Sequence, residues 1–213
     1  MNRIVLALMS VLLVACNATQ PIKQDLSAFR AAPPRSILVV PVVNQSLDVD
    51  APNYLLSALP VPLAEKGYYV FPVNTTKYIL EQEGFYESDR IHNEAPQVLA
   101  KMFGADAILY VVIKRWDAQY AVLSAAVTVE FDYRLINKDG IELWKDSRKV
   151  VYSPQNNNQG GGAIGALIGA MVNAAITRAA PDYMPLARQA NQQALSGPNA
   201  LPNGPYFPTK PVQ

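Results

Sequence analysis

Few residues of this 213-residue sequence have the types and spacing that acid–base or nucleophilic catalysis requires. His92 is the only histidine, and no G-x-S-x-G turn is present to pair it with an activated serine. Two pairs of carboxylates, Asp48 with Asp50 and Glu81 with Glu83, have the side chains that glycoside hydrolysis uses. Such pairs on surface loops and helices are, however, commonly only solvated. We therefore predict no catalytic residue and a protein that is not an enzyme, with a cell-wall glycan hydrolase as the alternative.

Metal ions, cofactors and nucleic acids are not expected as ligands. One histidine and one cysteine are too few for a zinc site, and the chain has no P-loop and no convincing dinucleotide-binding motif. The chain carries 18 basic and 17 acidic side chains, so no basic excess is available for contacts with phosphates. The single cysteine also excludes an intramolecular disulfide.

The cysteine, Cys16, follows a stretch with the order of an export signal. A positive start at Arg3 is followed by an apolar run over 4–14, too short to span a bilayer comfortably, and by the small residue Ala15. This order resembles the lipobox of bacterial lipoproteins, in which the cysteine is acylated and becomes the new N-terminus. The resemblance implies acyl chains such as palmitate on Cys16 and sorting to the outer membrane, which Asn17 permits because it is not aspartate. An ordinary secretory signal with a chance cysteine is the alternative.

The first half of the mature chain alternates apolar runs with helical patterns. Strands that alternate with helices need crossover connections, which predicts a sheet with parallel members. Pro60 and Pro62 should break and restart the first helix. The expected strands are 36–43, 68–71 and 107–113, and the expected helices are 53–66, 74–84 and 94–103.

The second half is typical of an antiparallel hairpin. Residues 121–136 alternate between apolar and polar side chains, as in a strand with one face in water, and 141–152 return after a turn at 137–140 that contains Gly140. The predicted fold class is therefore α/β shading to α+β, a mixed sheet with a parallel βαβ-type first half and helices over one face.

The chain divides by composition into four parts. We expect a signal peptide at 1–15, a polar tether at 16–34, a single α/β domain at 35–195, and a proline-rich flexible tail at 196–213. Within the domain, the last helix is expected at 181–195 with an interruption at Pro185.

Gly161, Gly165 and Gly169 repeat every four residues before that last helix, in a stretch rich in small side chains. Glycines at this spacing fall on nearly one helix face and let two helices approach closely. The helix is expected either to lie on the protein's own sheet or to form a candidate interface with a partner or a second copy. It is too short and polar at its end for a membrane span.

The chain as a whole resembles a family of proteobacterial outer-membrane lipoproteins typified by a neisserial surface lipoprotein antigen. The resemblance lies in the lipobox and in four further stretches of the sequence. It implies a fold similar to the N-terminal domain of TolB and to CsgG- and LpoB-like envelope lipoproteins, and a CsgG-like lipoprotein as partner. It brings no catalytic residues. The four stretches are 34–41, 51–54, 59–73 and 105–107, and the triple glycine at 160–162 fits the same pattern.

The function that these observations favour is a non-enzymatic interaction module, lipid-anchored at the outer membrane, in an envelope assembly, secretion or transport complex. The domain would face either the periplasm or the cell surface, and self-association stays open. A surface adhesin is a further alternative.

Overall fold

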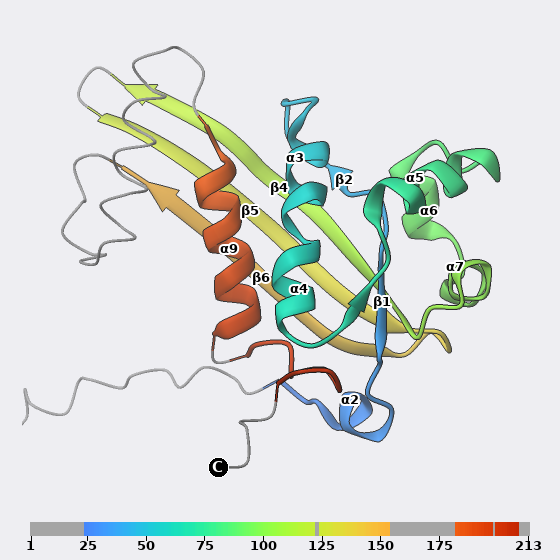
Figure 1. Cartoon of the computed structure of the whole chain (residues 1–213). Coiled ribbons are helices and arrows are strands. Elements are labelled where there is room, and N and C mark those ends of the chain that lie inside the picture. Colours follow the sequence, from blue (N-terminus) through green and yellow to red (C-terminus); the bar gives the residue numbers. More distant parts are fainter. Residues whose placement is uncertain (1–23, 122–123, 154–181, 198, 209–213) are drawn as a thin grey trace, which may run out of the picture.

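The computed structural model describes residues 24–121, 124–153, 182–197 and 199–208 (Figure 1). These residues form one mixed sheet with helices on its faces, so the predicted fold class is confirmed. The strands are β1 (Ser36–Val39), β2 (Val43–Asn44), β3 (Tyr69–Val70), β4 (Ala107–Ala121), β5 (Ser124–Asn137) and β6 (Glu142–Tyr152). The helices are α2 (Ser27–Ala31), α3 (Ala51–Ala58), α4 (Pro60–Glu65), α5 (Val73–Gln82), α6 (Ser88–Asn93), α7 (Pro96–Phe103) and α9 (Met184–Ser196).

The sheet has a parallel half and an antiparallel half that share β4. Its strand order is β3-β1-β4-β5-β6, and β2 also pairs with β4. β1 lies parallel to β3 and β4, whereas β4, β5 and β6 are antiparallel. The parallel half comes from crossover connections through helices and the antiparallel half from hairpins, as the sequence predicts.

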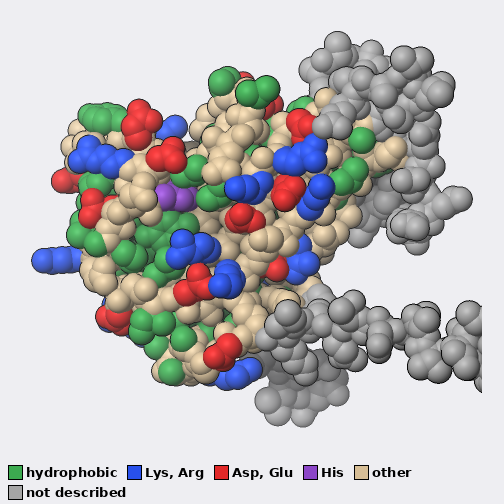
Figure 2. Space-filling model, turned by 180° about the vertical axis from the view of Figure 1, so that it is seen from behind, with side chains coloured by type: hydrophobic (Ala, Val, Ile, Leu, Met, Phe, Trp, Pro, Cys, Tyr) green, Lys and Arg blue, Asp and Glu red, His purple; other side chains and the backbone are tan. Residues whose placement is uncertain are grey.

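Helices cover both faces of the parallel half, which corrects the expectation of helices on one face. Ile37 and Val39 belong to one hydrophobic cluster, with side chains of α3, α4 and α9, while Leu38 and Val40 belong to the other, with side chains of α5, α6 and α7. The physical reason is the continuous apolar run of β1, in which successive side chains point to opposite faces. On the antiparallel half, α9 packs against β5 and β6 from one side. Among the described residues no helix covers the opposite side, which is called the bare face below (Figure 2).

Strand β4 is longer than predicted, because it continues beyond residue 113 to Ala121. The extension begins with a register shift between Ile113 and Arg115. The polar residues that follow Ile113 interrupt the apolar pattern, and for that reason the sequence predicts the end of the strand there. In β5 the predicted alternation is confirmed: the side chains of Val127, Val129, Phe131, Tyr133 and Leu135 are all buried. Gly140 in the following turn has φ +87°, in the left-handed region.

The packed part of the chain extends beyond both expected ends of the domain, 35 and 195. Helix α2 lies within the expected tether, and its Phe29 is buried in the core. Leu201 lies within the expected flexible tail and is fully buried. Pro185 does not interrupt α9 but stands in its first turn, where a missing N–H costs no helical hydrogen bond.

Candidate functional site

A groove between α4, α9 and the segment 203–207 is a feature that could receive a partner. Its volume is about 670 Å³. Its lining mixes apolar side chains with amides and a few charges, which suits a peptide or protein partner more than a small polar metabolite. The apolar lining residues are Val61, Pro62, Met184, Leu195 and Phe207, and the polar ones include Glu65, Lys66, Arg188, Asn191, Gln192 and Asn203.

The α4 wall of the groove follows from the prolines of the sequence. Pro60 opens α4 in its first turn, and the short helix then buries Leu63 in the core. The same turn directs Val61 into solvent, with 64% of its surface exposed. Helix α4, which is fixed to the core through Leu63, therefore presents the apolar side chain of Val61 at the rim of the groove.

The opposite wall, α9, is held close to the sheet by small side chains. Ala187, Ala190 and Ala194 are buried, whereas Arg188 and Gln192 on the other side of the helix face the groove or solvent. Alanines permit a short distance between helix and strand. This packing fixes the position of the polar side chains that line the groove.

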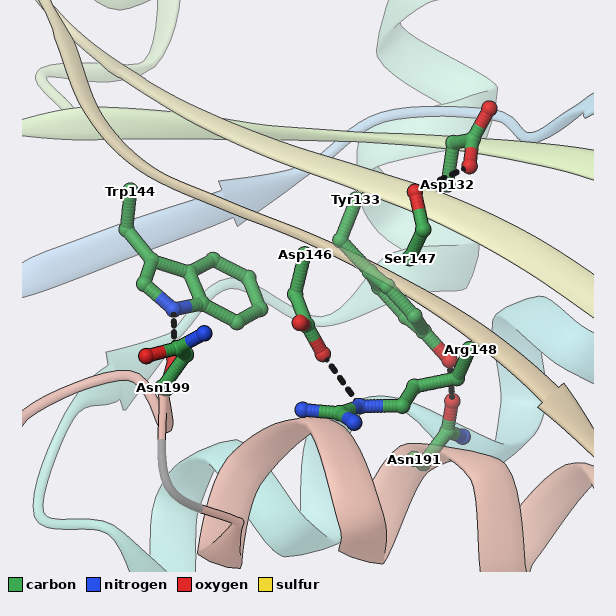
Figure 3. A network of polar contacts seen from close by, with 8 residues as sticks. All are labelled: Asp132, Tyr133, Trp144, Asp146, Ser147, Arg148, Asn191 and Asn199. Carbon is green, nitrogen blue, oxygen red and sulfur yellow. Dashed lines mark hydrogen bonds and ion pairs between the residues drawn. The ribbon is translucent and has the colours of Figure 1, made fainter. Parts of the chain in front are cut away.

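A buried polar link under α9 joins this helix to β5 and to the end of α3. The hydroxyl of Tyr133 on β5 donates to Oδ1 of Asn191 on α9 at 2.7 Å, and Asn191 Nδ2 donates to the carbonyl of Ala58 at the end of α3 at 3.4 Å (Figure 3). Asn191 is 1% exposed, and burial raises the pKa of Tyr133 well above its ordinary value. Because buried polar groups are costly without partners, this link favours one position for α9.

Two further contacts involve side chains of the edge strand β6 on the side that faces α9 (Figure 3). Arg148 Nε donates to Asp146 Oδ2, and Trp144 Nε1 donates to the carbonyl of Asn199 at 2.9 Å. Burial raises the pKa of Asp146 even though Arg148 lies beside it and opposes that shift. Desolvation thus outweighs the ion pair, as is common for partly buried pairs. Inward-pointing charges of this kind also protect an edge strand from pairing with another chain.

Beside the groove, α4 is joined to α9 through Lys66 and to the C-terminal segment through a close contact between two glycines. Lys66 Nζ donates to the carbonyl of Leu195 in the last turn of α9 at 2.9 Å, and burial lowers the pKa of this amine. Gly67 has φ +82°, and a Cβ there would collide with the backbone nitrogen of Phe207. A Cβ on Gly204 would collide with the carbonyl oxygen of Gly67. The segment 203–207 can therefore follow α4 this closely only with glycine at both positions.

The bare face of β4, β5 and β6, on the side opposite α9, has a different character. Lys and Arg side chains are intermingled there with Asp and Glu (Figure 2), and they pair with one another across and along the strands. Figure 3 shows Asp132 and Ser147 on the side of the sheet away from α9. The pairs are Arg115–Asp117 at 3.0 Å, Arg134–Glu142 at 3.1 Å, Lys145–Glu142 at 2.9 Å, Lys149–Glu130 at 4.0 Å and the Ser147–Asp132 hydrogen bond at 2.6 Å.

His92 and Asp48, which were considered as candidate catalytic residues, make contacts that hold neighbouring parts of the fold in place. His92 Nε2 lies 3.0 Å from the carbonyl oxygen of Pro41, its ring packs edge-on against Tyr110, and burial lowers its pKa. Asp48 Oδ1 accepts the backbone N–H groups of Asp50 and Ala51 ahead of α3. These contacts order backbone and ring positions.

The carboxylates considered for hydrolysis lie on two separate elements. Asp48 and Asp50 belong to the loop before α3, whereas Glu81 lies in the last turn of α5 and Glu83 directly follows it. Within the described ranges, no three His, Cys, Asp or Glu side chains gather as a metal site would need.

The residues predicted for anchoring and for a helical interface lie outside the described residues. These are Cys16, Asn17, Gly161, Gly165 and Gly169. Of the helices that are described, none combines the length and apolar character needed to cross a bilayer. The groove itself was not predicted, because α4 on one wall is far in the sequence from α9 and 203–207 on the others.

Comparison with known proteins identifies relatives over nearly the whole chain. Residues 24–206 match the family described as "Putative lipoprotein GNA1162-like". The Neisseria meningitidis serogroup B protein named "Putative lipoprotein NMB1124/NMB1162" is 33% identical over 211 residues, which is 97% of each chain. The crystal structure of lipoprotein GNA1162 from Neisseria meningitidis gives a TM-score of 0.56 at 36% identity, covering 68% of this chain and 99% of that one. The C-terminal domain of LpoB from Salmonella enterica gives a TM-score of 0.39 at 19% identity, covering 59% of this chain and 91% of that one.

Proposed function

Because the chain belongs to the GNA1162-like lipoprotein family, we propose that it is a non-enzymatic interaction module, anchored through acyl chains on Cys16 to the outer membrane. Its α/β domain serves an envelope assembly, secretion or transport complex. The partner is another envelope protein, of which a CsgG-like lipoprotein is the first candidate. Family membership supports the lipoprotein character, and the described structure supports the role in binding.

The observation that carries the binding role is the groove between α4, α9 and 203–207. A volume of about 670 Å³ is in the range of ligand and peptide sites. Val61 and Phe207 leave apolar surface open to solvent at its rim, while the polar link through Asn191 and Tyr133 fixes its base. A preformed groove with a fixed base lowers the ordering cost of binding.

The anchor is tested by replacing Cys16 with serine and fractionating the cells. Two or three long acyl chains hold a protein in a bilayer essentially permanently, because each buried methylene contributes about 0.8 kcal/mol. We expect the wild type in the outer-membrane fraction after a high-salt wash and the Cys16→Ser variant outside it. A variant that remains with the outer membrane would contradict the anchor. Asn17→Asp tests the sorting role. We expect this variant to stay with the membranes but to be absent from the outer-membrane fraction.

The groove is tested by complementation of a deletion strain with Val61→Glu and, as matched control, Val151→Glu. Both valines are exposed, at 64% and 53%, so neither change should lower the stability by much. Val61 lines the groove, whereas the register Thr128↔Val151 places Val151 on the bare face. We expect Val61→Glu to lose function at normal abundance and Val151→Glu to retain it. The opposite result, or equal activity of the two variants, would contradict a role for the groove.

A further inference from the structure

The turn at 204–208 presents two aromatic rings to solvent from a segment that is otherwise held firmly. Tyr206 is 62% exposed and Phe207 42% exposed, while Leu201 in the same segment is fully buried. Exposed aromatic rings on a fixed backbone are typical of a surface that meets another phase or another molecule.

The backbone of this turn has no unpaired N–H group. Gly204 N donates to the carbonyl of Lys66 at 2.7 Å, Tyr206 N to that of Gly67 at 3.0 Å, and Phe207 N to that of Gly204 at 3.1 Å. Pro205 and Pro208 have no N–H. Residues 199–208 also include no charged side chain. The turn can therefore leave water without the cost of an unsatisfied donor or a desolvated charge.

The turn lies at the end of the domain where the N-terminal part of the chain enters. Both ends of the described chain are at this end of the molecule in Figure 1. Helix α2 packs against β6, and Trp144 near the start of β6 donates to the carbonyl of Asn199. From Cys16 to the first described residue, Gln24, there are eight steps along the chain, which reach at most about 29 Å.

From these observations we propose that Tyr206 and Phe207 rest in the headgroup layer of the lipid bilayer, so that the domain meets the membrane both through its anchor and through this turn. The inference rests on the proposed acylation of Cys16. Tyrosine and phenylalanine suit this depth, since their rings are apolar and the tyrosine hydroxyl stays hydrated. Phe207 also lines the groove, so the groove opens close to the bilayer and favours a partner that is itself held at the membrane.

The proposal is tested on the full lipidated protein in vesicles of phosphatidylethanolamine and phosphatidylglycerol. Since Cys16 is the only native cysteine and its sulfur is consumed by the lipid, Tyr206→Cys introduces the one free thiol for a nitroxide label. Tyr86→Cys is the matched control, because Tyr86 is also a tyrosine and is 73% exposed between α5 and α6. Collision of each label with oxygen, which enters lipid, and with a nickel chelate, which stays in water, is measured by electron paramagnetic resonance.

We expect the label at 206 to collide several-fold more with oxygen than with the chelate, relative to the label at 86. Equal, water-like behaviour of the two labels on protein that floats with the vesicles would overturn the membrane contact while leaving the anchor intact. A label at 206 that neither reagent reaches would overturn it in favour of a protein partner or a second copy. Protein that does not float with the vesicles would overturn the anchor and this proposal with it.

Discussion

On one side of β4, β5 and β6, α9 and the C-terminal segment border a groove with apolar side chains at its rim. On the other side, the bare face, no described helix covers the sheet and charged side chains are exposed (Figures 1 and 2). The two sides share the same strands, and alternate residues of each strand contribute to them. The two sides differ in what their exposed side chains contact. On the bare side the charges have partners within the chain, and at the groove rim apolar side chains face solvent.

The ion pairs of the bare side contribute little to stability, because exposed pairs are each worth about 0–1 kcal/mol. Their effect is on association: a partner that covered Arg134, Glu142 and Lys145 would have to desolvate charges that already pair with one another. At the groove, a partner that covers Val61 removes apolar surface from water instead. The comparison supports the proposal that a partner binds on the groove side rather than on the bare face.

The largest effect is expected from Gly67→Ala, which should detach one wall of the groove. A left-handed backbone costs an alanine roughly 1–2 kcal/mol, and the added Cβ would collide with the backbone of Phe207. Overpacking adds about 1–3 kcal/mol. We expect a loss of about 2–5 kcal/mol in the free energy of unfolding, or faster hydrogen exchange confined to residues 203–207, because the segment gives way first.

Gly84→Ala is the control for that change. Gly84 has the same φ of +82°, but no atom lies within 4 Å of its added Cβ. It should lose only the roughly 1–2 kcal/mol of backbone strain, and exchange at 203–207 should stay at the wild-type rate. Equal losses in the two variants would show that the contact between Gly67 and the C-terminal segment contributes nothing.

A smaller loss is expected from Asn191→Leu, which breaks the polar link under the groove. Leucine is similar in volume but leaves the hydroxyl of Tyr133 buried without a partner, at a cost of about 1–3 kcal/mol. Asp132→Ala on the bare side removes a hydrogen bond of similar length to Ser147 in an exposed position, and should change stability by less than about 1 kcal/mol. Urea unfolding of both variants provides the measurement, and similar losses would contradict the distinction between the two sides.

The double variant Asn191→Leu with Tyr133→Phe sharpens this result. It removes both partners of the hydrogen bond, so no buried hydroxyl is left unpaired. We expect it to recover part of the stability that Asn191→Leu loses. A double variant that loses the sum of the two single changes would show that the residues are not coupled.

The smallest effect is a difference in the pH dependence of the two sides. Burial raises the pKa of Asp146 beneath α9. On the bare side burial acts in the same direction on Glu142, but the hydrogen bonds and charges of Lys145 and Arg134 outweigh it and lower the pKa of Glu142. A raised folded pKa means that ionisation of Asp146 disfavours the native state as the pH rises from its ordinary value of 3.8. A lowered pKa means that Glu142 stabilises the native state above its ordinary value of 4.5 and loses this effect as the pH falls.

Urea unfolding between pH 3 and pH 7 should therefore give opposite slopes. The stability of the wild type relative to Asp146→Asn should fall as the pH rises, and its stability relative to Glu142→Gln should rise. Slopes of the same sign would contradict the opposite pKa shifts of the two carboxylates, raised by burial in Asp146 and lowered by Lys145 and Arg134 in Glu142.

The sequence was sufficient for the elements whose signals are local. The apolar run of β1 predicts a strand buried on both faces, the alternation of 127–135 predicts a half-exposed strand, and Gly104 after α7 has the left-handed conformation expected of a helix end. These signals depend on residues within one strand or one helical turn, and so they can be read from the sequence directly.

The parts that could not be predicted depend on contacts between distant residues. The continuation of β4 was missed because its polar side chains, such as Arg115 and Asp117, belong to the bare face and interrupt the apolar pattern. The order of 199–208 depends on Gly67 and Gly204, which are 137 residues apart in the sequence but touch in the fold. The prolines of that segment are typical of a flexible tail. The only signal in the sequence for a packed segment is the apolar side chain of Leu201, which is buried in the fold.

We propose that a partner binds on the groove side of the sheet and not on the bare face. This proposal is tested most directly by incorporating a photo-reactive phenylalanine analogue at Val61 and, in a second strain, at Val151, followed by illumination of living cells. We expect one discrete cross-linked envelope protein from position 61 and none from position 151. The cross-link from position 61 should be lost when Cys16→Ser releases the protein from the membrane. A cross-link from position 151 alone, or the same products from both positions, would contradict the proposal.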